Sequence, residues 1–144
     1  MTVLLDTHVW VWWLTAGPAL ATAVRDALDA RAERGQLCIS AISLWEAQML
    51  HAKKRLDLPL EFPEWLRRAA APEVVTVMPL DVQVIAALDR LPGRFHGDPA
   101  DRLIVSTARA HDFPLVTYDQ RIRRARVAKL WKPPSRRRAR LTTR

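Results

Sequence analysis

The sequence predicts a three-layer α/β/α domain with a central, mainly parallel sheet of four or five strands. Short apolar runs rich in β-branched residues alternate along the chain with longer segments of helical spacing. That order is typical of a parallel sheet whose two faces are covered by helices. A length of 144 residues allows one substantial core and is short for two typical domains.

The first half of the chain contains two strand and three helix candidates. TVLL at residues 2–5 is a short apolar strand, and HVWVWWL at 8–14 follows it as a short helix. Residues 19–35 have apolar residues at helical spacing and end in a glycine, which predicts a second helix. QLCIS at 36–40 is the second strand. Residues 41–55 are again helical, with a basic last turn that suits the helix dipole.

The second half repeats this alternation. A proline at residue 63 opens a short helix to residue 71, and VVTVM at 74–78 is the third strand. DVQVIAALDRL at 81–91 is helical and ends at a Pro-Gly break, after which HGDPADRL leads into a helix through His111. The remaining strands are predicted at PLVTYD, 114–119, and, at the edge of the sheet, at VAKLW, 127–131.

Composition argues against membrane-spanning and secreted proteins. No segment reaches 18 uninterrupted apolar residues, and no charged N-terminal region precedes a cleavable apolar run. We therefore expect a cytoplasmic protein with no membrane association. The single cysteine, Cys38, cannot form an internal disulfide and lies in an apolar run, so we expect it to fill the core.

The net charge of +8 comes from one end of the chain. Residues 121–144 hold 11 of the 23 Lys and Arg and none of the 15 Asp and Glu, which leaves 12 − 15 = −3 for residues 1–120. A basic end of this kind attracts polyanions such as RNA or DNA without reading sequence. We predict a folded domain over 1–132 and a flexible basic extension over 133–144. A solubilising or partner-docking role for the extension remains the alternative.

Five acidic residues occupy positions unusual for purely structural acids. Asp6 and Asp119 follow the first and fourth strands, at the sheet edge where open α/β folds bind ligands. Asp98 and Asp101 lie in the loop and first turn of the helix that ends at His111. Glu46 stands on an apolar helical face. Taken singly, the aspartates are typical of helix caps or turns and the glutamate of an arginine pair.

Electrostatics indicates what must accompany such a cluster. Two carboxylates about 5 Å apart repel by ~3 kcal/mol at an effective dielectric constant near 20. Four of them form six pairs, whose sum rivals the roughly 5–15 kcal/mol that stabilises a whole domain. Either some acids stay protonated or a cation neutralises them, and an all-oxygen set suits Mg²⁺ or Mn²⁺. Such an ion activates water against a phosphodiester, and no protein nucleophile is needed.

Four motifs together resemble a known family. LLDTHVWVWWL, ISAISLWEA, HGDPADRLIVSTA and LVTYD, in this order and spacing, are similar to the PIN-domain nucleases, and specifically to the VapC ribonuclease toxins of toxin–antitoxin pairs. The resemblance covers roughly residues 2–131. It implies a PIN-like fold, Mg²⁺- or Mn²⁺-dependent endoribonuclease activity, homodimers, and inhibition by a cognate antitoxin whose tail covers the active groove.

The resemblance also implies the site residues. By motif, Asp6 and Asp119 match the acids that follow the first and fourth strands. Glu46 matches the acid of the ISAISLWEA motif, and Asp101 that of the D-R-L-I helix. These four are the expected catalytic and metal-binding residues. Asp98 matches the extra acid of a D-P-x-D-R subgroup and is expected to support them.

Four further residues are candidates for supporting roles. Thr7, Thr117 and Ser43 have hydroxyls placed to hold the acids or a metal-bound water, with routine capping as the alternative. Arg102 is a candidate to contact the RNA backbone or to hold Asp98, with a surface ion pair as the alternative. For the tryptophans we expect core positions for Trp10 and Trp45 and assign none to RNA.

Two other functions remain open at this stage. A metal–water mechanism does not use the 2′-hydroxyl, so a PIN-type nuclease of RNA processing or DNA repair has the same acids. A non-catalytic RNA-binding module would rely on the basic extension. The small size without an added recognition domain favours the toxin, and the intact acid set argues against the non-catalytic module.

Overall fold

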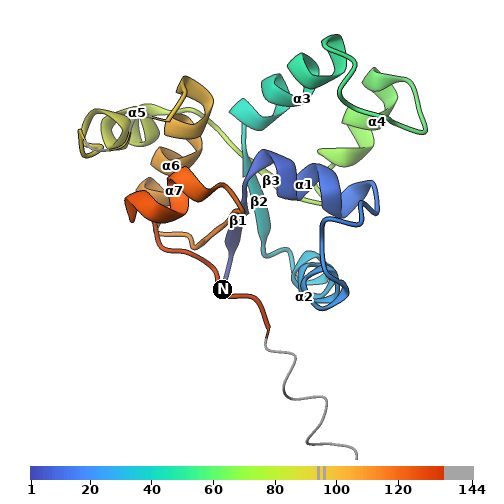
Figure 1. The fold of residues 1–144 in the computed structure, drawn as a ribbon, viewed down its shortest axis with the longest axis horizontal. Helices are drawn as coiled ribbons and strands as arrows, with labels where there is room; N and C mark the ends of the chain where they lie inside the picture. Colours follow the sequence, from blue (N-terminus) through green and yellow to red (C-terminus); the bar gives the residue numbers. More distant parts are fainter. Residues whose placement is uncertain (94, 96, 135–144) are drawn as a thin grey trace, which may run out of the picture.

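The computed structural model describes residues 1–93, 95 and 97–134 and confirms the three-layer architecture (Figure 1). Four parallel strands form the central sheet in the order β3-β2-β1-β4. Because every neighbouring pair is parallel, all four carboxyl ends meet at one edge of the sheet. The strands are β1 (Val3–Leu5), β2 (Leu37–Ser40), β3 (Thr76–Met78) and β4 (Leu115–Val116).

Helices connect the strands and cover the sheet on both sides. In Figure 1, α1, α2 and α4 lie to the right of the sheet and α5, α6 and α7 to its left, with α3 above the strand ends. The described helices are α1 (Thr7–Leu14), α2 (Thr22–Glu33), α3 (Ile42–Ala52), α4 (Phe62–Ala69), α5 (Val82–Asp89), α6 (Pro99–His111) and α7 (Gln120–Ala125).

Alternation along β1 divides the core in two. Val3 and Leu5 face the layer of α1, α2 and α4, where Trp10 is fully buried and its indole donates to the Ala69 carbonyl at 3.1 Å. Leu4 faces the opposite layer and packs with Ile104 of α6. Side chains of a short, doubly covered strand are all buried, as a parallel sheet requires. Both cores therefore fix β1, and with it the residue that follows.

The structure departs from the sequence prediction at the C-terminal edge. The predicted fifth strand, 127–131, is reduced to one parallel bridge between Leu130 and Leu115, so the described sheet has four strands. The backbone still bonds Leu115 on either side of this bridge: the Leu115 amide donates to the Lys129 carbonyl at 2.8 Å, and the Trp131 amide donates to the Leu115 carbonyl at 2.9 Å. Between these segments the chain forms α7, a helix that the sequence reading did not assign.

Several single-residue predictions have clear outcomes. Cys38 is buried and burial raises the pKa of its thiol to about 12, which confirms it as an unreactive core residue. Trp10 is in the core as expected, whereas Trp45 is 50% exposed because it lies on the outward side of α3. No helix within the described ranges is long and apolar enough to span a membrane. Most of the predicted extension lies outside the described residues, so its boundary stays a prediction.

Candidate active site

The register between β1 and β4 places Asp6 beside Thr117. Leu5 pairs with Val116, and the Asp6 amide extends the pairing by donating to the Val116 carbonyl at 3.0 Å. The next residues on the two strands therefore meet, and the Thr117 hydroxyl donates to Asp6 Oδ2 at 2.6 Å. The same hydroxyl accepts a bond from the Asp119 amide at 3.0 Å. One buried threonine thus ties two candidate acids to the sheet edge.

Helix α3 brings Glu46 to the same edge. The Thr7 hydroxyl donates to Glu46 Oε1 and lies 2.7 Å from the hydroxyl of Ser43, which is fully buried one turn earlier on α3. Glu46 is thereby held against the start of α1 by a threonine instead of an arginine. The predicted supporting positions of Thr7, Ser43 and Thr117 agree with these contacts.

Helix α6 contributes the remaining two acids. Asp98 caps the helix, with Oδ1 accepting from the Asp101 amide at 2.8 Å, and Pro99 follows at the first helical position. Asp101, in the first turn, is only 9% exposed. Ala100 and Ile104 on the same helix are buried, so core packing fixes the direction in which Asp101 points.

The raised pKa of Asp101 indicates that the five acids share one region. Burial, followed by the negative charges of Asp98, Asp6, Asp119 and Glu46, raises the pKa of Asp101 to about 7. Burial also raises the pKa of Glu46, with Asp6 and Asp98 adding to the rise and the Thr7 hydrogen bond opposing it. The other four acids that the sequence singled out therefore all appear among the neighbours that disfavour ionisation of Asp101.

The alternative role given for these aspartates, as helix caps, is also observed. Asp6, Asp98 and Asp119 cap α1, α6 and α7, and in each case Oδ1 accepts the capping bond. Helix N-termini carry partial positive charge, so three of them pointing at one place offset part of the repulsion between the acids. Capping and clustering are compatible, because a cap engages one carboxylate oxygen and can leave the other to face the site.

Comparison with known proteins agrees with this geometry. The pattern of the PIN domain matches residues 3–128, most of the chain. This chain belongs to the PIN-domain family. It is 39% identical over 122 residues to Ribonuclease VapC22 of Mycobacterium tuberculosis, covering 85% of this chain and 90% of that protein. The resemblance to the VapC group is therefore confirmed.

Two solved structures agree with the PIN fold. One is the crystal structure of VapBC2 from Rickettsia felis bound to a promoter DNA fragment. Its TM-score is 0.69 and its sequence identity 19%, and the match covers 93% of this chain and all of that one. The other is FitAB bound to the IR36 DNA fragment, with a TM-score of 0.65 and 22% identity over 90% of this chain and 94% of that one. At such identities the two structures speak for the fold alone.

Two residues of this PIN domain approach the acids without having been singled out in the sequence. His8 Nδ1 lies 3.4 Å from Asp6 Oδ2, and its Nε2 accepts from the Tyr118 amide at 3.1 Å. Arg121 reaches Asp101 Oδ2 at 3.6 Å and Asp119 Oδ1 at 4.0 Å. The signal for Arg121 was the Asp119 cap followed by QRIRRA, which predicts α7 once read as a helix start. His8 stands two residues beyond Asp6, inside a motif already quoted.

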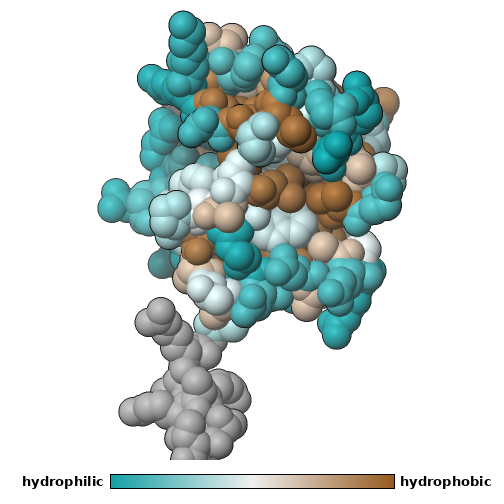
Figure 2. Space-filling model, turned by 90° about the vertical axis from the view of Figure 1, so that its right-hand side faces the viewer, coloured by the Kyte–Doolittle hydropathy of each residue, from teal (hydrophilic) through white to brown (hydrophobic). Residues whose placement is uncertain are grey.

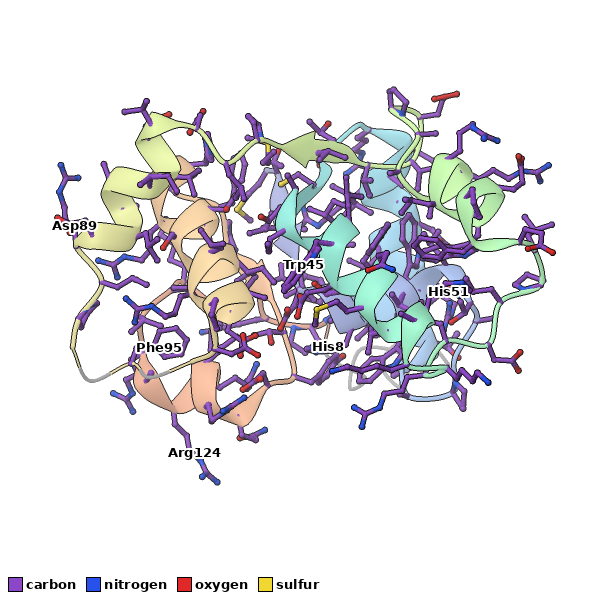
Figure 3. The ribbon with its side chains drawn as sticks, turned by 90° about the horizontal axis from the view of Figure 1, so that it is seen from above. His8, Trp45, His51, Asp89, Phe95 and Arg124 are labelled. Atoms are coloured by element: carbon purple, nitrogen blue, oxygen red, sulfur yellow. The ribbon has the colours of Figure 1, made fainter. Side chains whose placement is uncertain are left out.

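The loop before α6 is packed closely around the site. Arg102 donates to the Phe95 carbonyl at 3.0 Å, so its guanidinium is held by the loop and not by Asp98. A Cβ at Gly97 would lie 2.5 Å from Phe95 Cζ and 3.1 Å from Asp101 Cβ, which explains why this position has no side chain. In Figure 3, red oxygen atoms gather between the labelled His8 and Phe95.

The donor set of the PIN site suits a hard cation, although the side chains do not form a finished cage. Carboxylates and hydroxyls are the ligands preferred by Mg²⁺ and Mn²⁺. Across the described part of the chain, no three His, Cys, Asp or Glu stand together in an arrangement ready to hold an ion. Burial is the largest cause of the raised pKa of Asp101, and the negative charges of the four neighbouring acids add to it; a cation would relieve that second contribution.

Proposed function

We propose that this PIN domain is an Mg²⁺- or Mn²⁺-dependent endoribonuclease and the toxin of a toxin–antitoxin pair, which hydrolyses RNA phosphodiester bonds with a metal-activated water in the cytoplasm. The observation that carries the proposal is the placement of Asp6, Glu46 and Asp119 at one sheet edge with Asp98 and Asp101 beside them, where burial and the charges of the other four acids raise the pKa of Asp101. The relative VapC22, a ribonuclease by name, supports RNA as the substrate.

Asp6, Glu46, Asp101 and Asp119 would hold the ion. When bound, the ion lowers the pKa of water, orients it towards the phosphodiester and neutralises charge on the departing oxygen. The chain's own contribution is to hold the acids in place beforehand. Thr117 fixes Asp6 and the Asp119 backbone, while Thr7, backed by Ser43, fixes Glu46. Such supporting hydrogen bonds orient ligands and raise metal affinity.

An antitoxin partner is proposed from the same relationship. VapBC2 and FitAB are by name two-component assemblies, and this chain shares their fold. A recess of about 470 Å³ adjoins His8 between α1 and the end of α3, lined in part by Val11, Trp12 and Leu50. Hydrophobic side chains gather over α1 and α4 on the face shown in Figure 2. An apolar segment followed by a basic residue would suit this recess and the acids beside it.

A homodimer is also proposed. Val82 is 86% exposed and Ile85 46% exposed on α5, and Leu80 immediately before the helix is 36% exposed. Exposed apolar side chains gathered on one short element mark an association surface more often than isolated ones do. Sedimentation of the wild type beside Val82→Asp would test this, since a charge at the centre of an interface is expected to give monomers.

The activity test uses purified, antitoxin-free protein and total RNA with and without Mg²⁺. Cleavage is expected only with the metal, and Asp6→Asn should abolish it while Asp26→Asn, an exposed acid on α2, should not. Cleavage that persists in chelator, or that survives Asp6→Asn undiminished, would contradict the mechanism. Offering single-stranded DNA of the same sequence separates an RNA-cleaving toxin from a general PIN nuclease.

A cellular test addresses the toxin role. Expression of the wild type is expected to arrest growth, and co-expression of the cognate antitoxin to restore it. Asp6→Asn should be harmless at equal protein level. Normal growth on expression of an RNA-cleaving wild type would indicate a processing enzyme in place of a toxin.

A further inference from the structure

A small recess lies directly behind the strand end that carries the acids. It has a volume of about 240 Å³ and is lined by Thr117, Tyr118, Gln120, Arg123 and Trp131, with Pro133 at its rim. This is below the roughly 300–1,000 Å³ of drug-sized ligand sites, so it suits a single ring system. None of its side chains belongs to the four predicted metal ligands.

The recess and the acid cluster share their backbone. Thr117 contributes its hydroxyl to Asp6 and its carbonyl to Arg123 Nη1, at 2.6 and 3.1 Å. Tyr118 and Gln120, the residues on either side of Asp119, both line the recess, so the recess adjoins this acid along the chain.

Two aromatic residues border the recess, and both are held in place. The Tyr118 amide is bonded to His8, and the Tyr118 ring packs 5.9 Å from that of Trp12 while remaining 40% exposed. The Trp131 amide donates to the Leu115 carbonyl at 2.9 Å, and its indole packs against the core. Fixed aromatic surfaces with an exposed side are what unpaired bases stack upon.

Polar groups occupy the other side of the recess. Gln120 supplies both a donor and acceptors through its amide, which is the pair of functions that reads the edge of a base. Arg123 supplies positive charge and a planar guanidinium. Aromatic walls with a few polar groups are typical of a site that orients a flat, polar ring.

The charge distribution favours a nucleic acid as the source of that ring. Trp131 and Pro133, which line the recess, lie beyond residue 128, where the PIN-domain match ends. In the sequence, residues 135–144 carry five arginines after these residues. A polyanion is the partner that such a sequence attracts.

We propose that this recess binds one unpaired nucleobase of the RNA, next to the phosphate that is cleaved, and so contributes to the choice of cleavage site. Tyr118 and Trp131 stack on the base, and Gln120 reads its edge. The inference rests on the proposed function for its substrate, but it concerns binding and not the hydrolytic step.

The test measures RNA affinity without cleavage. Full-length Asp6→Asn protein with Mg²⁺ is titrated with fluorescent single-stranded RNA decamers of U, A, C or G. Adding Trp131→Ala to the Asp6→Asn protein is expected to weaken RNA binding roughly tenfold, as loss of one stacked base does. Trp131→Phe should remain within about threefold of the parent, and Trp45→Ala, an exposed tryptophan on α3, should not change affinity. Gln120→Ala should alter the ranking of the four decamers.

The other two variants separate an effect on folding from an effect on RNA binding. The exposed Gln120→Ala and the conservative Trp131→Phe retain the fold even where Trp131→Ala lowers the melting temperature. Unchanged affinity in Trp131→Ala together with an unchanged ranking in Gln120→Ala would overturn the proposal. Loss of antitoxin binding with normal RNA affinity would assign the recess to the antitoxin and equally overturn it. Failure of the wild type to cleave RNA would reject the proposed function and leave this binding test intact.

Discussion

The hydroxyl of Thr117 donates to Asp6 Oδ2 at 2.6 Å across the adjacent ends of β4 and β1. Both residues are buried, and Thr117 also receives the Asp119 amide, so one side chain orients two of the proposed ligands. The arrangement follows directly from the parallel register of the two strands, in which Leu5 pairs with Val116. The sheet therefore sets the geometry of the site before any ion or RNA is bound.

Thr117→Val should impair activity more than stability. The change leaves Asp6 Oδ2 without its hydroxyl donor, which costs about 1–3 kcal/mol, while Oδ1 keeps the Thr7 amide. Loss of such a supporting bond typically lowers activity or metal affinity by roughly 10–100-fold. Thr117→Ser keeps the hydroxyl and is expected to retain most of the cleavage rate. Equal rates for the valine and serine variants would show that the hydroxyl does not orient Asp6.

Stability of the metal-free protein should fall as the pH rises from about 4 to 7. Burial and four neighbouring acids raise the pKa of Asp101 from 3.8 to about 7, so in this window the folded state holds a proton that the unfolded state has lost. Unfolding then releases that proton, and it becomes more favourable with increasing pH. Above about pH 7 both states are ionised and this contribution levels off.

Asp101→Asn provides the check, since an amide resembles the protonated acid in shape and has no charge. In chelator, the melting temperature of the variant should exceed that of the wild type at pH 8 and approach it at pH 4. Asp112→Asn, on an 80% exposed side chain paired with Lys129, is the control. A difference between Asp101→Asn and the wild type that does not vary with pH would argue against a protonated Asp101.

Gly97→Ala should disturb the site through packing. The added methyl group would meet the buried Phe95 ring at 2.5 Å and Asp101 at 3.1 Å, so one of them must move. Overpacking of this kind costs about 1–3 kcal/mol and shifts nearby side chains. Gly93→Ala, where a methyl group meets nothing within 4 Å, is the matched control. Cleavage by Gly97→Ala at the Gly93→Ala rate would mean that the loop adapts without moving Asp101.

Most of the fold could be predicted from the sequence because its elements differ clearly in period. Buried strands such as Val3–Leu5 are short apolar runs. Helices such as α6 begin with a capping residue and a proline and continue with regular apolar spacing. The fifth strand could not be judged this way. Whether VAKLW pairs along its length depends on how far β4 extends, and β4 has only two residues.

The site residues could be predicted where an acid interrupts the apolar pattern of a helix. Asp101 on a core-facing helix and Glu46 on an apolar helical face conflict with burial unless a function requires them. Residues that agree with their surroundings gave no such signal. His8 lies inside the first motif as an ordinary helix residue, and Trp45 is a residue type common in cores but points outward. The recess beside Tyr118 depends on Trp131 returning to β4.

Binding of Mg²⁺ should stabilise the wild type and do so more at high pH. An ion that binds only the folded state adds about 2.7 kcal/mol at a hundredfold excess over its dissociation constant. For a chain of this size that corresponds to a rise of roughly 5–10 °C in melting temperature. Because the ligands must be ionised, the rise should shrink as the pH falls below about 7, where Asp101 takes up its proton.

Asp119→Asn should lose most of the rise, whereas Asp26→Asn should keep it. An equal rise in melting temperature in all three proteins would mean that Mg²⁺ binds elsewhere and that the carboxylate cluster is not the metal site.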